Sequence, residues 1–469
     1  MTTIDFKAEV DKRKEAMLED LSNLLSINSE RDDSKADAKH PFGPGPVKAL
    51  EFFLALAERD GYQTRNIDNY AGDFEFGQGD EVLGIFAHLD VVPAGSGWET
   101  DPYKPVIKDN RIYARGSSDD KGPTMACYYA LKIIKELGLP VSKRVRFIVG
   151  TDEESGWGDM DYYFAHNGLK NPDFGFSPDA EFPIINGEKG NITEYLHFAG
   201  QNAGAFVLHR FQGGLRENMV PESATALISS PHELNVIEAS LEQFLSEHAV
   251  TGSVKEVDGL FEVTIIGKSA HGSTPEAGVN GATLLAKFLN QFSFDGAAKA
   301  YLHIAGEVLH EDFAAEKLGL AYTDDKMGAL SMNAGVFSFA KDSDDNTIAL
   351  NFRYPKGINA AVLKAGLEQL PGLTKVTLSE HEHTPHYVPM DDELVSTLLS
   401  VYEKQTGLKG YEQVIGGGTF GRLLERGVAF GAMFPGDENT MHQANEYMPL
   451  ENIYRSAAIY AEAIYELIK

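Results

Sequence analysis

Apolar residues recur along the first third of the chain with two different spacings. Residues 6–27, 46–59 and 122–137 carry apolar side chains at the spacing of an amphipathic helix. Short runs that are almost wholly apolar, typical of buried strands, occupy residues 82–87, 145–150 and 174–177. Strands that alternate with helices in this way predict an α/β domain with a mostly parallel sheet.

The pattern changes near residue 188 and changes back near residue 382. Between these points, strand patterns at 191–198, 224–229 and 260–267 are mixed with helix patterns at 231–247 and 282–292. After residue 382 the chain returns to the first pattern, with a helix at 391–405, a strand at 428–434 and a last helix at 450–468. We therefore predict one α/β domain, residues 1–187 and 382–469, which is interrupted by an inserted α+β domain, residues 188–381.

Composition narrows the class of partner. A chain of 469 residues is longer than one hydrophobic core usually serves, so more than one domain is expected. Its 41 basic and 70 acidic residues give a net charge of −29. Such a charge repels phosphate backbones and anionic lipid, so we predict no nucleic-acid and no membrane partner. One cysteine, Cys127, excludes an intrachain disulfide. The chain shows no signal-peptide pattern and no apolar run of roughly 18–20 residues, so we expect it in the cytoplasm.

The first candidate for chemistry is His88, which ends a predicted strand. Ligands of parallel sheets bind beyond the carboxyl ends of the strands. Asp90 lies two residues further on and points the same way in an extended chain. Its carboxylate could accept the second ring N–H and fix the tautomer that a metal-bound histidine needs. A histidine at a strand end is, by itself, more often structural.

Two acidic segments follow on neighbouring loops. Asp119 and Asp120 precede a predicted helix, where they are either helix caps or a carboxylate that bridges two cations. Their chemistry does not separate the two residues. Asp152, Glu153 and Glu154 follow the strand 145–150, and three adjacent acids cost energy unless solvent or cations offset their charge. A solvated acidic loop is the simpler interpretation of this segment.

Asp179 follows the strand 174–177, and His442 lies between the last strand and the last helix. Together these segments place imidazole and carboxylate groups on the strand-end loops of one domain. Such ligands suit Zn²⁺, Mn²⁺ or Co²⁺. Five ligands rich in carboxylates predict two metals about 3.5–4 Å apart. The pair Glu153 and Glu154 then offers one ligand and one general base.

The segments occur in the order of a known family. His-x-Asp-Val-Val-Pro, Arg-Gly-x-x-Asp-Asp-Lys-Gly, Asp-Glu-Glu-x-Gly, Ser-Pro-Asp and His-x-x-Asn-Glu together resemble the M20 metallopeptidases. Residues 176–188, 414–419 and 457–466 are similar to the PepV-type dipeptidases of lactic-acid bacteria, also called carnosinases or Xaa-His dipeptidases. The resemblance implies a zinc-peptidase-like catalytic domain with an inserted lid.

The resemblance also implies a role for each strand-end residue. It implies two Zn²⁺ per subunit, with Mn²⁺ or Co²⁺ as alternatives. The family's Asp-x-Lys-Gly spacing selects Asp119 over Asp120 as the bridge. The implied roles are His88 and Asp179 on one metal, Glu154 and His442 on the other, Asp119 between them, Glu153 as general base and Asp90 orienting His88.

In the family, the lid supplies a histidine to the reacting carbonyl, and the Ser269–Pro275 segment matches its motif at His271. Asn218, Arg353, Gly417 and Thr419 are the expected substrate-binding residues, since an arginine fork suits a terminal carboxylate. The alternative for His271 is a histidine of a surface loop, and the alternative for Asn218 and Arg353 is a strand residue with a local partner. The insertion is about 190 residues long, longer than the lids of the smaller, dimeric members, which favours a monomer.

These inferences predict a metal-dependent dipeptidase that hydrolyses unmodified small peptides. One alternative is an M20-type deacylase or desuccinylase acting on N-acyl amino acids. Another is a metal-binding or regulatory protein that has lost catalysis. Glu153 argues against the second alternative, because a protein that only binds metal needs no base beside the ligands.

Overall fold

The computed structural model describes residues 4–469. The chain forms two compact units. The first contains the chain up to Gly187 together with Tyr387–Gln413 and Gly418–Lys469, and the second contains Glu188–His386 and Val414–Gly417. The short strands β9 (Gly187–Glu188), β20 (His386–Tyr387) and β21 (Val414–Ile415) lie where the chain passes from one unit to the other.

The division differs from the predicted domain limits in two places. The chain returns to the first unit at Tyr387, five residues after the predicted return at 382. The predicted limits place the segment Val414–Gly417 in the α/β domain, whereas in the structure it belongs to the second unit. Its Gly416 carbonyl accepts a 2.8 Å hydrogen bond from Arg353 of that unit.

A six-stranded sheet organises the first unit. Its order is β1 (Thr64–Ile67), β2 (Ala71–Gly77), β6 (Arg144–Gly150), β3 (Val82–His88), β7 (Phe174–Ser177) and β22 (Gly427–Ala429). The strands from β6 to β22 are parallel, whereas β1 and β2 are antiparallel to their neighbours. The predicted α/β class with a mostly parallel sheet is confirmed.

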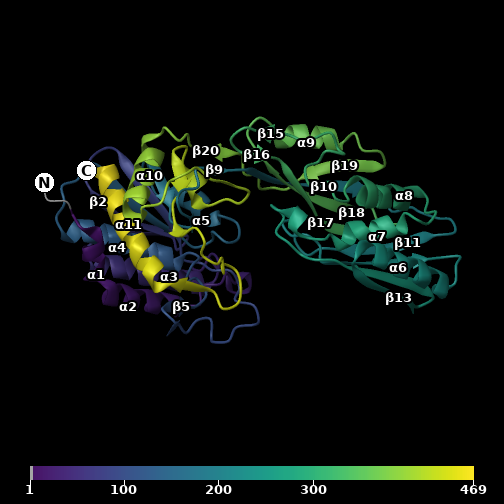
Figure 1. Cartoon of the computed structure of the whole chain (residues 1–469), viewed down its shortest axis with the longest axis horizontal. Coiled ribbons are helices and arrows are strands. Elements are labelled where there is room, and N and C mark those ends of the chain that lie inside the picture. Colours follow the sequence, from purple (N-terminus) through teal and green to yellow (C-terminus); the bar gives the residue numbers. More distant parts are fainter. Residues whose placement is uncertain (1–3) are drawn as a thin grey trace. The chain divides into compact units, whose positions relative to one another are not determined.

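Both faces of this sheet are covered, which explains why its central strands β3 and β7 are almost wholly apolar. In β3, Leu83, Ile85 and Ala87 face the main core, while Phe86 joins a smaller cluster on the other face. The main core includes α3 (Pro44–Arg59), α4 (Lys121–Glu136) and α11 (Leu450–Ile468), and α4 and α11 contact each other (Figure 1). On the other face lie α5 (Gly158–His166) and η4 (Phe420–Leu423).

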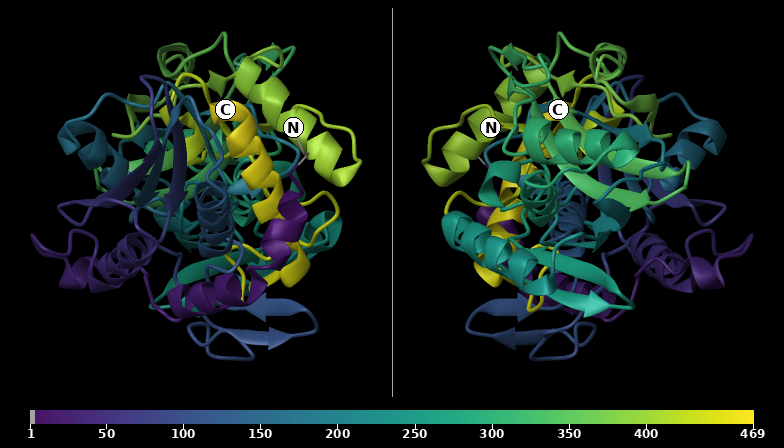
Figure 2. Two further views of the ribbon diagram at one scale, coloured as in Figure 1. Left: turned by 90° about the vertical axis from the view of Figure 1, so that its left-hand side faces the viewer. Right: turned by 90° about the vertical axis from the view of Figure 1, so that its right-hand side faces the viewer.

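Two predicted elements are interrupted. The helix expected over residues 6–27 is two helices, α1 (Phe6–Asp11) and α2 (Lys14–Leu25). The break lets α1 lie against α11 (Figure 2) while α2 contacts α4. The strand expected over residues 428–434 is split into β22 and β23 (Ala432–Met433) by Gly431, whose φ of +81° is outside the range of a strand.

The other elements of the first unit are η1 (Asp33–Lys35), β4 (Val106–Lys108), β5 (Arg111–Tyr113), β8 (Ala180–Glu181), α10 (Glu393–Thr406) and β24 (Tyr447–Pro449). β24 pairs with β5, and β5 with β4. In residues 4–469, no helix is both long and apolar enough to cross a membrane.

The second unit contains an eight-stranded antiparallel sheet. Its order is β13 (Thr251–Val257), β14 (Leu260–Ile266), β12 (Ser223–Ser229), β11 (Val207–Gly213), β17 (Ser331–Ala340), β18 (Asn346–Tyr354), β10 (Gly190–Phe198) and β19 (Leu373–Leu378). Its helices are α6 (Leu234–His248), α7 (Gly281–Leu289), α8 (Gly296–His303) and α9 (Ala360–Leu367) (Figure 1). Its short elements are η2 (Pro275–Ala277), η3 (Ile304–Val308), β15 (Thr323–Asp324) and β16 (Gly328–Ala329).

Alternation along the strands explains this unit's core. In β10, Ile192, Leu196 and Phe198 are buried in one cluster with residues of the four helices. The inserted unit is therefore α+β, as predicted from the alternating texture of residues 188–381.

Candidate metal centre

The sheet of the first unit brings the predicted ligands together. β6, β3 and β7 are adjacent and parallel, so their carboxyl ends lie at one edge. His88 is the last residue of β3, Asp179 follows β7, and Glu154 follows β6. Asp119 precedes α4, and His442 precedes β24.

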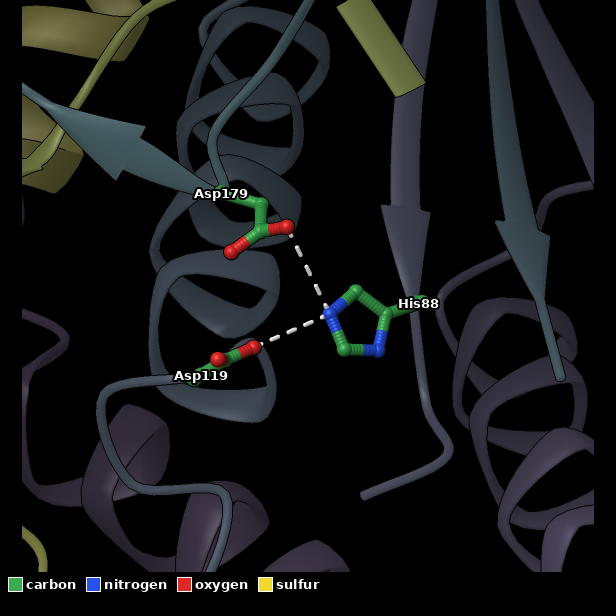
Figure 3. A group of neighbouring side chains, drawn as sticks. All are labelled: His88, Asp119 and Asp179. Carbon is green, nitrogen blue, oxygen red and sulfur yellow. Dashed lines mark hydrogen bonds and ion pairs between the residues drawn. The ribbon is translucent and has the colours of Figure 1, made fainter. Parts of the chain in front are cut away.

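The first group of ligands is His88, Asp119 and Asp179 (Figure 3). Nε2 of His88 lies 3.1 Å from Oδ1 of Asp119 and 3.6 Å from Oδ2 of Asp179. The candidate ligand atoms lie within 4.8 Å of one another. The histidine is buried, because its strand lies in the middle of the sheet.

The second group is Asp119, Glu154 and His442. Nε2 of His442 lies 2.9 Å from Oδ2 of Asp119 and 3.2 Å from Oε2 of Glu154. Asp119 thus takes part in both groups and directs a different oxygen to each. A carboxylate placed in this way is suited to bridge two cations.

The neighbouring Asp120 has a different environment. Its Oδ2 accepts the backbone N–H of His88 at 3.2 Å and the hydroxyl of Thr124 at 2.9 Å. It is fully buried beside the start of α4 and belongs to neither ligand group. Asp119 thus lies in both candidate groups and Asp120 in neither, and the assignment of Asp119 as the bridge stays a prediction.

Asp90 holds two parts of the site. Nδ1 of His88 lies 3.0 Å from the backbone oxygen of Asp90 and 3.4 Å from its carboxylate, so the backbone oxygen is the nearer acceptor. The carboxylate also accepts the backbone N–H groups of Glu153 and Glu154, at 3.2 and 3.1 Å. Asp90 therefore contacts the histidine mainly through its backbone oxygen, whereas the predicted acceptor was its carboxylate, and that carboxylate holds the loop that carries the two glutamates. That Asp90 orients His88 stays a prediction.

The charges in the site are unbalanced without cations. Burial, together with Asp119, raises the pKa of Glu154 to about 7 in spite of His442. Burial also raises the pKa of Asp179 and lifts that of Glu153 well above its usual value. Burial opposes the charged form of His442, but its bonds to Asp119 and Glu154 raise its pKa to about 11.

The donor set fits a pair of divalent cations. Within residues 4–469, Oε1 of Glu154 is buried and has no hydrogen-bond partner, which is costly for a carboxylate oxygen unless a cation lies beside it. Two imidazoles and three carboxylates match the ligands of Zn²⁺, Mn²⁺ or Co²⁺. Glu153 belongs to neither ligand group.

The predicted substrate residues lie mainly in the second unit. The backbone oxygen of Asn218 accepts the N–H of Gly272 at 2.7 Å, so the segments of Asn218 and His271 run side by side. Nδ1 of His271 lies 2.7 Å from Oγ of Ser273. Nε of Arg353 donates to Asn351 at 3.1 Å.

The predicted turn containing Gly417 and Thr419 is divided between the units. Gly417 belongs to the second unit and Thr419 to the first. The Thr419 hydroxyl accepts the N–H of Gly421 at 3.0 Å and caps η4. Its side chain thus has a structural contact in addition to any contact with substrate.

Glu446 and Arg115 have no predicted role, although both lie in the predicted motifs. They form a buried ion pair of 2.6 Å at the rim of the ligand groups. The sequence did contain a signal for this pair, because Glu446 is the single acid of the His442 motif and Arg115 is the single arginine of the Asp119 motif. Nothing local indicated that residues so far apart in the sequence would meet.

The sequence model of peptidase family M20/M25/M40 matches residues 84–466. A beta-Ala-Xaa dipeptidase of Lactobacillus delbrueckii subsp. lactis is 45% identical over 469 residues, with 99% of each chain covered. Human carnosine dipeptidase 1 has a TM-score of 0.54 at 15% identity, with 98% of each chain covered. The aminoacylhistidine dipeptidase of Vibrio alginolyticus has a TM-score of 0.56 at 14% identity, covering 97% of this chain and 96% of its own. At these identities the two structures show the fold alone.

A parallel sheet whose strand ends gather two groups of histidine and carboxylate ligands is an arrangement typical of metal-dependent hydrolases. The chain belongs to peptidase family M20/M25/M40, and the resemblance found in its motifs is confirmed.

Proposed function

We propose that this chain is a two-metal dipeptidase that hydrolyses the peptide bond of unmodified dipeptides. The observation that carries the proposal is the position of Asp119, which directs one oxygen to each ligand group. The relative named beta-Ala-Xaa dipeptidase supports the substrate class, because it is similar over nearly the whole of both chains.

The metal ligands in this proposal are the five residues of the two groups. His88 and Asp179 would hold one cation and Glu154 and His442 would hold the other, with Asp119 contributing one oxygen to each group. When bound, a pair of Zn²⁺ ions would acidify a water molecule and polarise the scissile carbonyl. Mn²⁺ or Co²⁺ would suit the same ligands.

Glu153 is the general base in this mechanism. The water oxygen forms a bond to the carbonyl carbon while Glu153 takes the water's proton. Glu153 then gives that proton to the leaving nitrogen as the C–N bond breaks. Asp90 keeps the base in place, because its carboxylate accepts the backbone N–H of Glu153.

The second unit supplies the substrate contacts in this proposal. Arg353 binds the terminal carboxylate of the dipeptide, aided by Asn218 and by the turn at Gly417 and Thr419. Asn351 supports this role by holding the Nε side of the guanidinium. His271 stabilises the oxyanion. The predicted monomer and cytoplasmic location belong to the same proposal.

The test is Glu153→Ala. We expect the variant to keep the metal content of the wild type and to lose at least about 100-fold in kcat, since proton transfer contributes about 10²–10⁴-fold. Metal content is measured by atomic emission, and kcat with unmodified dipeptides. Glu81→Ala, at an exposed glutamate just before β3, is the matched control and keeps both values.

Wild-type kcat/KM is compared in the same assay for a dipeptide, a tripeptide and an N-acyl amino acid. Wild-type turnover in Glu153→Ala would exclude the assigned base. A preference for the N-acyl substrate would contradict the proposed substrate class and leave the metal chemistry intact.

A further inference from the structure

The carboxylate of Glu446 is the most heavily hydrogen-bonded acid near the metal ligands. It is fully buried, with no exposed surface. Oε2 accepts from Arg115 Nη1 at 2.6 Å and from the Gly116 N–H at 3.1 Å. Oε1 accepts from the Ser118 N–H at 2.8 Å, the Ser118 hydroxyl at 3.0 Å and the Asp119 N–H at 3.2 Å.

All five donors belong to the segment that carries the bridging carboxylate of Asp119. Glu446 itself follows His442, a ligand of the second group, by four residues. One carboxylate therefore fastens together two ligand segments that are 327 residues apart in the sequence. The same two segments are also joined by strand pairing, since Tyr447 of β24, directly after Glu446, pairs with Tyr113 of β5.

Arg115 extends the connection to a third segment. Its Nη2 donates to the backbone oxygens of Pro93 and Ala94, both at 3.4 Å. These residues follow Asp90 and therefore belong to the loop beyond β3. The ion pair thus contacts the loops after β3 and β5 and the segment before β24.

Stability alone is a poor explanation for this arrangement. Glu446 has no exposed surface, so its charge has been removed from water entirely, which carries a desolvation cost. A buried ion pair often gains no more than it loses through desolvation. The hydrogen bonds do fix the geometry of the site, because every donor belongs to the segment that carries Asp119.

We propose that Glu446, paired with Arg115, is a positioning residue of the metal centre that sets the spacing between Asp119 and His442. The inference rests on the proposed two-metal function. Its action is indirect: the carboxylate holds the backbone from Gly116 to Asp119 against the segment of His442.

Glu446→Gln changes the hydrogen bonding with almost no change in shape. The new amide NH₂ must face either Nη1 of Arg115 and the N–H of Gly116 or the backbone N–H groups of Ser118 and Asp119, and all four of these groups can only donate. The loop must then move away on one side. We expect the Zn²⁺ affinity of the full chain to fall 10–100-fold, the usual loss when a residue that supports metal ligands is changed.

Asp73 offers a matched control. It is a fully buried carboxylate of the same unit that accepts from Arg65 at 2.8 Å and from the Tyr163 hydroxyl at 2.6 Å. Neither of these two partners belongs to a ligand group. Asp73→Asn should lower the melting temperature while its Zn²⁺ affinity stays within about twofold of the wild type.

The Zn²⁺ affinity is measured by competition against a chromophoric chelator. The far-UV circular dichroism spectrum of each variant checks that it is folded. The absorption spectrum of the Co²⁺-loaded protein should also change in Glu446→Gln and stay unchanged in Asp73→Asn. Glu446→Asp, which keeps the charge but shortens the reach, should lose Zn²⁺ affinity too, and it is the deciding variant if Glu446→Gln does not fold.

Wild-type affinity in a folded Glu446 variant would overturn the inference, as would an equal loss of affinity in Asp73→Asn. A wild-type protein that binds fewer than two Zn²⁺ ions would instead overturn the proposed function. The two failures are therefore distinguishable.

Discussion

Asp119, Glu446 and Glu194 are buried carboxylates whose surroundings give them different chemistry. Asp119 faces two histidines, and although burial works against its charge, their hydrogen bonds hold its pKa well below its usual value. Glu446 is surrounded by donors of one loop. Glu194, in β10 of the second unit, has neither, since both of its oxygens lack a hydrogen-bond partner within residues 4–469.

Glu194 should make stability depend on pH. Burial raises its pKa to about 8, against the ordinary value of 4.5, so between these values the folded state binds more protons than the unfolded state. Stability is therefore lost as pH rises from about 4.5 towards 8. Each pKa unit corresponds to about 1.4 kcal/mol, so the penalty reaches a few kcal/mol.

Glu194→Gln should remove this penalty. We expect the variant and the wild type to melt at similar temperatures at pH 5, and the variant to melt several degrees higher at pH 8. Melting curves of both proteins at each pH give the difference, in which other titrating groups cancel. A constant difference across the range would show that Glu194 does not carry this pH dependence.

Strand ends determine the site at the scale of elements. The loop after β6 carries Glu153 and Glu154, and Asp159 of α5 fixes its start. Oδ2 of Asp159 accepts the N–H of Thr151 at 2.7 Å and that of Asp152 at 2.9 Å. A Cβ added to Gly150 would lie 2.1 Å from this oxygen.

Gly150→Ala should therefore displace Asp159 and the loop with it. We expect a fall in stability of about 1–3 kcal/mol, typical of overpacking, together with a loss of dipeptidase activity of at least tenfold. Gly156→Ala, further along the same loop, is the control, because its added Cβ comes no closer than 3.4 Å to another atom. Equal activity in the two variants would show that the tight contact at Gly150 is not needed.

Elements with one dominant pattern could be predicted from the sequence. The strand 174–177 and the helix 450–468 have the predicted limits, because each lies in the core of a single unit. The helix expected over 6–27 and the strand expected over 428–434 were wrong in their continuity. Their breaks depend on packing against α11 and on the φ of Gly431, which hydrophobic periodicity does not report.

The same limit applies to the site. The strand-end rule located the segments of His88, Glu154 and Asp179, which each follow a predicted strand, whereas Asp119 was located by the predicted helix after it and His442 only between the last predicted strand and the last helix. It did not give Glu446 a role, because the partners of that carboxylate are about 330 residues away. Nor did it show that the Asp90 carboxylate holds the backbone of Glu153 and Glu154.

At the scale of the whole molecule, charge links stability to metal. The chain has a net charge of −29, and three of its carboxylates meet in the two ligand groups with two histidines. Removal of the cations leaves the acids of the groups without their counter-charge. A ligand that binds only the folded state at 100 times its Kd adds about 2.7 kcal/mol of stability.

Chelation should therefore lower both activity and stability, and Zn²⁺ should restore both. We expect dipeptidase activity to disappear in a strong chelator and the melting temperature to fall by several degrees, since the proposed metal sites form only in the folded first unit. Hydrogen exchange locates the effect: amides of residues 116–119, 153–154 and 442–446 should exchange faster after chelation, while those of β13 and β14 in the second unit stay unchanged. Faster exchange of equal size throughout both units would contradict a local metal centre, because cations held by the first unit's ligands stabilise their own loops first.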